Sequence, residues 1–270
     1  MKHLLYVAAL VGLTQANVAW AQLASPNEAG VAMGHLHLNV RDVQAEKKLW
    51  IELGGVPAYQ LSANANREVV KFPGVLVAIA KQREEPTGGS VGSVVDHVGF
   101  KVPNVQTAIA KWKAAGLAVQ SGANGRKDQA FVTTRDGLKI EILEESSMSL
   151  PIAMQHIHFF VTEAALPEIE EYYVKFYGAK LGKRGQFDIA TLPGVELAFS
   201  KSSESTATTK GRVLDHIGFE VVDLEAFCKK MQASGVKFTR DYRKQDIFGI
   251  AVLTDPWGVA MELTEGQRQY

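Results

Sequence analysis

The sequence predicts an α+β fold in which one unit, a strand, a helix and then two or three strands, occurs four times. The first observation is an internal repeat: Gly34–Val40 resembles Gln155–Val161, and Val95–Phe100 resembles Leu214–Phe219, each about 120 positions later. The second is that each half contains two similar strands, each followed by a helical pattern. Helices would then cover one face of each sheet and leave the opposite face concave and free for a site.

Each predicted helix has start and stop residues in their usual places. Asp42 can cap the first helix, in which Ala45, Leu49 and Leu53 share one face. The other three helices follow the same plan. All four end at a glycine, so the expected ranges are 42–54, 104–116, 167–178 and 223–235.

Short apolar runs follow every helix and predict further strands. The strands that open the four units are expected at 35–40, 97–102, 156–161 and 216–221. The clearest later strands are expected at 69–72, 75–80, 130–134, 138–143, 187–192, 195–199, 250–254 and 259–263. The segment Ser146–Pro151 lies between the two halves and is expected to be a linker.

Alternation along these strands separates two faces, because successive side chains point to opposite sides of a sheet. In the first strand, Leu36 and Leu38 would pack under the helix, whereas His35 would face the concave side. The other opening strands alternate in the same way, and a late strand of each half adds a glutamate to the concave side. The candidates on this side are His35, His37, His97, Lys101, Glu141, His156, His158, His216, Glu220 and Glu262.

This arrangement predicts metal binding. Two imidazoles and a carboxylate form a set that binds Fe²⁺, Mn²⁺, Zn²⁺ or Ni²⁺ and leaves positions open for a ligand. Taken by halves of the chain, the expected sets are His35, His97 and Glu141, and His156, His216 and Glu262. No catalytic residue is predicted, and the candidates to support the ligands are His37, His158, Lys101 and Glu220. The alternative is a polar lining of the cup without a metal.

Charge and cysteine content exclude several classes of protein. Lys plus Arg and Asp plus Glu are both 29, so the formal net charge is zero. The chain therefore lacks the basic excess of a general nucleic-acid binder. Its single cysteine, Cys228, rules out an intrachain disulfide and a cysteine-based zinc cluster.

The N-terminus has the layout of a secretory signal peptide at residues 1–21. Lys2 precedes the apolar run Leu4–Leu13, and the segment ends in Ala19-Trp20-Ala21. A buried N-terminal helix is the alternative. The mature chain would begin at Gln22 and would be exported, to the periplasm or the medium. No other long apolar run follows, so we expect no membrane span.

At these motifs the chain resembles the vicinal oxygen chelate superfamily, which includes glyoxalase I, bleomycin resistance proteins and extradiol dioxygenases. The resemblance rests on Asp96–Phe100, Asp215–Phe219 and Asp255–Gly258, with Glu262 after them. It implies βαβββ modules paired into two domains, 33–145 and 154–265, with concave mixed sheets. It also implies that the opening-strand histidines and late-strand glutamates bind a divalent metal. The partner would be a small-molecule substrate that chelates this metal through adjacent oxygens, with a homodimer as one option for assembly.

The expected function is that of an exported, metal-dependent lyase or isomerase. An extradiol-type dioxygenase and a non-catalytic small-molecule-binding protein of the bleomycin-resistance type are the alternatives. The fourth ligand of glyoxalase I-like sites is replaced here by Ala78 and Ala198. Val252 occupies the place of a tyrosine that ring-cleaving dioxygenases carry, which disfavours that alternative. The sequence leaves the metal, the substrate and the active half open.

Overall fold

The computed structural model describes residues 22–58, 66–245 and 248–269, so the predicted signal peptide at 1–21 lies outside the described residues. Four βαβββ modules follow one another, as predicted. Module 1 contains β1 (Val31–Asn39), α2 (Val43–Leu53), β2 (Val56–Pro57), β3 (Arg67–Phe72) and β4 (Val75–Ala80). Module 2 contains β5 (Val95–Val102), α3 (Val105–Ala114), β6 (Val119–Ser121), β7 (Gln129–Thr133) and β8 (Lys139–Glu144).

The second half repeats this order. Module 3 contains β9 (Ala153–Val161), α4 (Leu166–Tyr177), β10 (Lys180–Arg184), β11 (Phe187–Leu192) and β12 (Val195–Lys201). Module 4 contains β13 (Leu214–Val221), α5 (Leu224–Ala233), β14 (Phe238–Lys244), β15 (Gly249–Thr254) and β16 (Ala260–Glu265). Short 3₁₀ turns lie at η2 (Ala123–Gly125), η3 (Glu163–Ala165) and η4 (Gln267–Gln269). None of the helices in the described part has the length and apolar character of a membrane span.

The helices begin where the capping residues predicted them to begin. The side chains of Asp42, Asn104 and Asp223 accept hydrogen bonds from backbone N–H groups three residues later, at 2.8 to 3.0 Å. The third helix lacks such a cap and instead has Pro167 in its first turn. It ends at Gly178, whose φ of 66° is in the left-handed region that favours glycine.

Two eight-stranded mixed sheets form the molecule, but they do not group the first two modules together and the last two together. The order in one sheet is β14-β15-β16-β13-β1-β4-β3-β2, and in the other it is β10-β11-β12-β9-β5-β8-β7-β6. Modules 1 and 4 therefore form one sheet, and modules 2 and 3 form the other. The expected pairing of module 1 with module 2 and of module 3 with module 4 is wrong, and the limits 33–145 and 154–265 do not coincide with either sheet.

The physical reason lies at the edges of the modules. Each module has its first strand at one edge, where its backbone groups are free to pair with the first strand of another module. All four first strands carry the same alternation, so their sequences do not select a partner. The observed pairs, β1 with β13 and β5 with β9, are antiparallel. They place module 3 beside module 2 and module 4 beside module 1.

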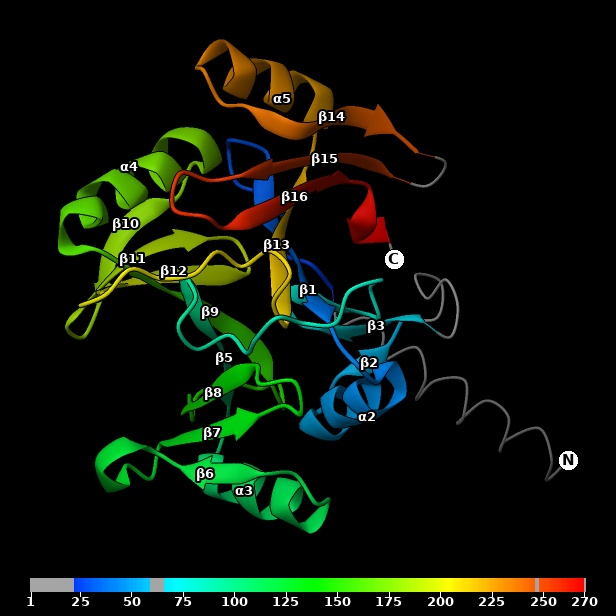
Figure 1. Ribbon diagram of the computed structural model, residues 1–270. Coiled ribbons are helices and arrows are strands. Elements are labelled where there is room, and N and C mark those ends of the chain that lie inside the picture. Colours follow the sequence, from blue (N-terminus) through cyan, green and yellow to red (C-terminus); the bar gives the residue numbers. More distant parts are fainter. Residues whose placement is uncertain (1–21, 59–65, 246–247, 270) are drawn as a thin grey trace, which may run out of the picture.

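Two connections carry the chain between the sheets, and they run side by side. Residues 81–94 link module 1 to module 2, and residues 202–213 link module 3 to module 4. Ser93 and Ala207 form a β-bridge, and Val94 N–H donates to the Ala207 carbonyl at 2.8 Å. Figure 1 shows the result, with α5 and α3 at opposite ends of the molecule.

Helix α2 packs on both sheets. Its Trp50 is fully buried, and its ring centroid lies 5.7 Å from that of Phe72 in β3 and 5.7 Å from that of Phe100 in β5. Because β3 and β5 belong to different sheets, this aromatic cluster joins the two sheets. The junction beside α2 is the place of a pocket described below.

Candidate metal centre

The pairing of β5 with β9 brings four ligand-type side chains together in one sheet. His97 lies on β5, Glu141 on β8, and His156 and His158 on β9; we call these four the inner cluster. All four are buried, and one ligand atom from each lies within 4.8 Å of the others. His97 Nε2 lies 3.1 Å from Glu141 Oε2, His156 Nε2 lies 3.2 Å from the same oxygen, and His158 Nδ1 lies 3.2 Å from His97 Nε2. Three imidazoles and one carboxylate thus point at a common space.

Neighbouring groups hold each of these ligands in place. Asp96 contacts Nδ1 of His97 at 2.7 Å, and Ser200 contacts Nε2 of His158 at 2.8 Å. Gln129 donates to Glu141, and Gln155 contacts Nδ1 of His156. With His97 Nδ1 donating to Asp96, the lone pair of Nε2 faces the cluster, which is the tautomer that a metal ligand needs.

The protonation states suit metal ligands. Burial lowers the pKa of His156 to about 4, and burial together with the nearby His97 lowers that of His158 to about 3. Burial raises the pKa of the Glu141 carboxyl, but hydrogen bonding with His156 and His97 outweighs this and holds it well below its ordinary value. Burial also opposes charge on His97, yet hydrogen bonds with Asp96 and Glu141 raise its pKa. Near neutral pH the cluster therefore offers a carboxylate and at least two neutral imidazoles.

One buried atom of the inner cluster lacks a hydrogen bond. His156 is fully buried, and its Nε2 makes no well-aligned hydrogen bond with any described residue, although Glu141 Oε2 lies 3.2 Å away. A buried polar atom without a partner is costly. Because Nε2 of His156 points at the same space as the other ligand atoms, a bound cation would satisfy it.

The sheet of modules 1 and 4 holds an equivalent but looser group. His35 and His37 on β1 and His216 on β13 have ligand atoms within 4.8 Å of one another, and we call these three, with Glu262 of β16, the outer cluster. Glu262 lies 3.7 Å from both His35 Nε2 and His216 Nε2. His216 Nε2 is again buried without a hydrogen bond to any described residue, and burial lowers the pKa of His35 to about 4. The carboxylate therefore stands further from its histidines than Glu141 does in the inner cluster.

The structure regroups the residues that the sequence singled out. His97 and Glu141 lie with His156 instead of His35, and His216 and Glu262 lie with His35 instead of His156. The expected sets by halves of the chain are therefore corrected. The cause is the strand pairing, since each cluster draws on two modules that share a sheet.

Of the four candidate supporting residues, two belong to the clusters and two do not. His158 and His37 supply ligand atoms to the inner and outer cluster. Glu220 is buried and accepts hydrogen bonds from Thr264 Oγ1 and Gly266 N–H; Thr264 also contacts Gln267, the residue that contacts His35. Lys101 lines a separate hollow with Gln155 and Glu196.

Sequence reasoning missed two amides that contact the clusters. Gln129 begins β7 and donates to Glu141, while Gln267 follows the last strand and contacts Nδ1 of His35 at 3.1 Å. Gln129 lies two residues before Phe131, which is the β7 residue opposite Glu141, so strand alternation provides a signal for it. Gln267 lies beyond the predicted strand, and the sequence provides no comparable signal.

A glycine in each central strand makes room for a histidine ring. A Cβ atom built on Gly99 would lie 2.1 Å from Cε1 and Nδ1 of His156, its partner on the neighbouring strand. Gly218 stands in the same relation to His35, at 2.1 Å from Cε1. This explains the glycine of the repeated Asp-His-x-Gly-Phe motif, because the imidazole from the partner strand lies across it.

Comparisons with known proteins agree with this architecture. The sequence pattern of the Glyoxalase/Bleomycin resistance protein/Dioxygenase superfamily matches residues 95–263. Glyoxalase I from Zea mays superposes with a TM-score of 0.67 at 16% identity, covering 88% of this chain and 94% of that one. A mutant of the same enzyme gives 0.69 at 17% identity, over 94% and 98%.

A further solved structure and a search of curated proteins complete the comparison. A putative dioxygenase from Bacillus subtilis superposes with a TM-score of 0.62 at 14% identity, covering 91% of this chain and 86% of that one. No curated protein matches the sequence. At these identities the solved structures show that the fold is shared, and they say nothing about whether the activity is shared.

Proposed function

Because the chain belongs to the Glyoxalase/Bleomycin resistance protein/Dioxygenase superfamily, we propose that it is an enzyme that uses a divalent metal bound by the inner cluster. Its substrate would be a small molecule that chelates the metal through adjacent oxygens. The observation that carries this proposal is the convergence of His97, Glu141, His156 and His158, with their ligand atoms within 4.8 Å.

The residues present fit a divalent metal. Imidazole nitrogens and a carboxylate oxygen suit Fe²⁺, Mn²⁺, Zn²⁺ or Ni²⁺. The buried Nε2 of His156, which makes no well-aligned hydrogen bond, is the kind of atom that such an ion satisfies. A cation held there would act as a Lewis acid on substrate oxygens. Glu141 supplies the negative charge, and Asp96 and Gln155 fix the rings of His97 and His156.

His158 occupies the place of the missing fourth ligand. The position on β12 where a carboxylate was expected is Ala198, and its partner on β9 is His158. The small alanine leaves room for the imidazole of His158, which Ser200 contacts at 2.8 Å and the ring of Phe160 stacks against at 4.9 Å. We therefore assign His158 to the ligand set of the inner cluster.

The residues beside the glutamates favour a lyase or isomerase over a dioxygenase. Phe131 is the strand partner of Glu141, and Val252 is the strand partner of Glu262. Ring-cleaving dioxygenases, which this chain resembles, carry a tyrosine at this place, and neither Phe131 nor Val252 has a hydroxyl group to replace it. The dioxygenase remains the second candidate. A binding protein without turnover is the third, and the buried ligand set disfavours it.

Export is part of the proposal and rests on the sequence alone. The charged start, the apolar run and the Ala-Trp-Ala site of residues 1–21 support secretion to the periplasm or the medium. Analysis of the N-terminus of the protein recovered outside the cytoplasm tests this, since cleavage would leave Gln22 first.

Metal analysis of the purified protein tests the central proposal. We expect about one equivalent of a divalent metal at the inner cluster, lost in Glu141→Gln and kept in Glu262→Gln, because only the first removes a ligand charge from that cluster. Less than about half an equivalent in the wild-type protein after incubation with each of the four metals would contradict it. Oxygen uptake with a panel of catechols separates the dioxygenase, which consumes oxygen, from the lyase or isomerase, which does not.

A further inference from the structure

A pocket whose lining includes no residue of either cluster lies at the junction of the two sheets. Its volume is about 510 Å³, within the range of small-molecule sites. One wall is the face of α2, and the other is formed by Ala115–Ala118 after α3 and Thr133–Arg135 after β7. Because α2 belongs to module 1 and the opposite wall belongs to module 2, the pocket lies between elements of the two sheets, and such junctions are a common place for ligands.

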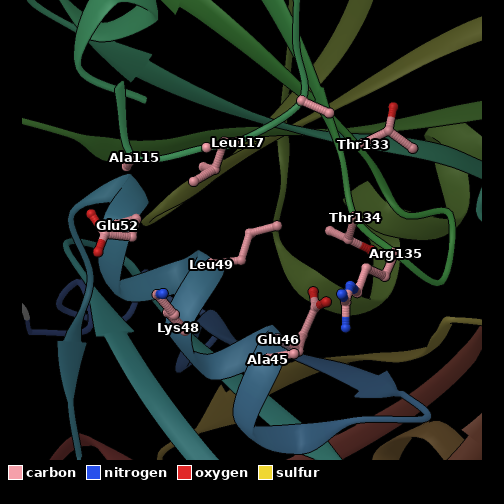
Figure 2. Close-up of a pocket in the computed structure, with 12 residues that line it drawn as sticks. Ala45, Glu46, Lys48, Leu49, Glu52, Ala115, Leu117, Thr133, Thr134 and Arg135 are labelled. Carbon is pink, nitrogen blue, oxygen red and sulfur yellow. The ribbon is translucent and has the colours of Figure 1, made fainter. Parts of the chain in front are cut away.

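A buried carboxyl group faces this pocket. Glu46 of α2 is only 3% exposed, yet it is one of the lining residues. Figure 2 shows its side chain directed from α2 into the space toward Thr134 and Arg135. Glu46 Oε1 accepts a hydrogen bond from Trp50 Nε1 at 2.9 Å, and no described residue donates to the other oxygen. A carboxyl oxygen that opens onto a pocket favours a ligand that donates to it.

The rest of the lining is apolar at depth and charged at the rim. Leu49 and Leu117 are half-buried and point into the same space (Figure 2), with alanines beside them. Lys48 and Arg135 are exposed and Glu52 is half-buried, so the rim carries both signs. The side chain of Arg135 is 79% exposed. Glu46 is the only buried residue among the charged side chains that line the pocket, so we expect its charge to determine which ligands bind.

The equivalent junction in the second half is filled. The β15–β16 turn matches the β7–β8 turn in its hydrogen bonds: Gly258 N–H donates to the Asp255 carbonyl at 3.2 Å, as Gly137 N–H donates to the Thr134 carbonyl at 3.0 Å. In that turn Trp257 packs edge-on against Tyr172 of α4, with ring centroids 5.5 Å apart. In the first half, the turn lacks an aromatic residue and the space is open. The pocket is thus specific to one half of a repeated fold.

We propose that this pocket is a binding site for a small organic amine with an apolar body. Its ammonium group would donate to Glu46, and its apolar part would cover Leu49 and Leu117. A charge-assisted hydrogen bond in a desolvated pocket is stronger than a neutral one, so an amine would bind better than an alcohol of the same shape. The site is separate from the inner cluster, and binding there would not require a metal.

Calorimetric titration of the full chain with benzylamine at pH 8, where the carboxyl group of Glu46 is ionised, tests the proposal. Benzyl alcohol serves as the neutral probe, benzoate as the anionic probe, and a chelator is present so that no amine binds to a metal. We expect saturable binding of benzylamine, with benzyl alcohol at least about tenfold weaker, which corresponds to about 1.4 kcal/mol. Benzoate should be the weakest of the three.

Three variants sharpen the test. Glu46→Gln keeps an acceptor for Trp50 but removes the negative charge. It should lower the affinity for benzylamine about tenfold. Ala118→Trp places a large side chain at an exposed lining position and should abolish binding. Glu52→Gln removes a carboxylate from the rim and should leave binding unchanged. Absence of saturable benzylamine binding, equal binding by Glu46→Gln, or preference for benzoate would each overturn the proposal.

Discussion

Glu46 makes the stability of the protein depend on pH. Burial raises the pKa of its carboxyl group to about 7 despite the hydrogen bond from Trp50, and the charge of Asp136 adds to the shift. In the unfolded chain the group has its ordinary pKa of 4.5. Between these values the folded protein holds a proton that the unfolded chain has released. The contribution of Glu46 to stability is therefore full below pH 4.5 and is lost as the pH rises through 7.

Urea unfolding of the wild-type protein and Glu46→Gln at pH 5 and pH 8 measures this effect. Gln keeps the hydrogen bond to Trp50 and has no charge to bury. From pH 5 to pH 8, the difference in unfolding free energy should shift in favour of the variant by at most about 3 kcal/mol, since one pKa unit is worth about 1.4 kcal/mol. Both proteins are measured without metal. Parallel pH profiles of the two proteins would show that Glu46 does not titrate in this way.

At the scale of elements, Gly99 of β5 leaves the space that the ring of His156 on β9 occupies. Gly99→Ala would place a methyl group 2.1 Å from the ring of His156, so the ring must leave its position. We expect the inner cluster to bind Co²⁺ at least about tenfold more weakly. The sheet should still form, with the free energy of unfolding lowered by about 1–3 kcal/mol because of overpacking.

The chain offers a matched control for this substitution. Gly182 is also in a strand, β10, and a Cβ there would meet Ile189 at an ordinary 3.7 Å. Gly182→Ala should therefore leave Co²⁺ binding unchanged. Gly218→Ala, which crowds His35, should spare the inner cluster as well. Wild-type affinity in Gly99→Ala would mean that His156 is not a ligand.

How much of these elements the sequence could predict depends on the range of the interaction. The N-caps Asp42, Asn104 and Asp223 act within three residues, and the structure confirms them. Strand alternation placed His97 and Glu141 on one face, because both positions are fixed within a single module. The presence of His156 in the same cluster depends on which two modules pair, and the four first strands are too similar to encode that in their own residues.

At the scale of the whole molecule, the middle of the chain contains one complete sheet and the terminal modules contribute the other. All four residues of the inner cluster lie between positions 97 and 158, within modules 2 and 3. The residues of the outer cluster come from modules 1 and 4, and the antiparallel pair β1 and β13 joins them. A cut through the linker between modules 2 and 3 therefore divides both clusters.

Two fragments, each of two modules, distinguish this arrangement from one in which module 1 pairs with module 2 and module 3 with module 4. Residues 88–208 contain modules 2 and 3 and should bind one Co²⁺ in a manner that depends on His156. Residues 22–150 contain modules 1 and 2, which share no sheet, and should not bind it. The first fragment loses the contact of Phe100 with Trp50, so it should be less stable than the full chain. Cobalt binding by 22–150 that depends on both His35 and His97, with none by 88–208, would show that modules 1 and 2 pair in solution.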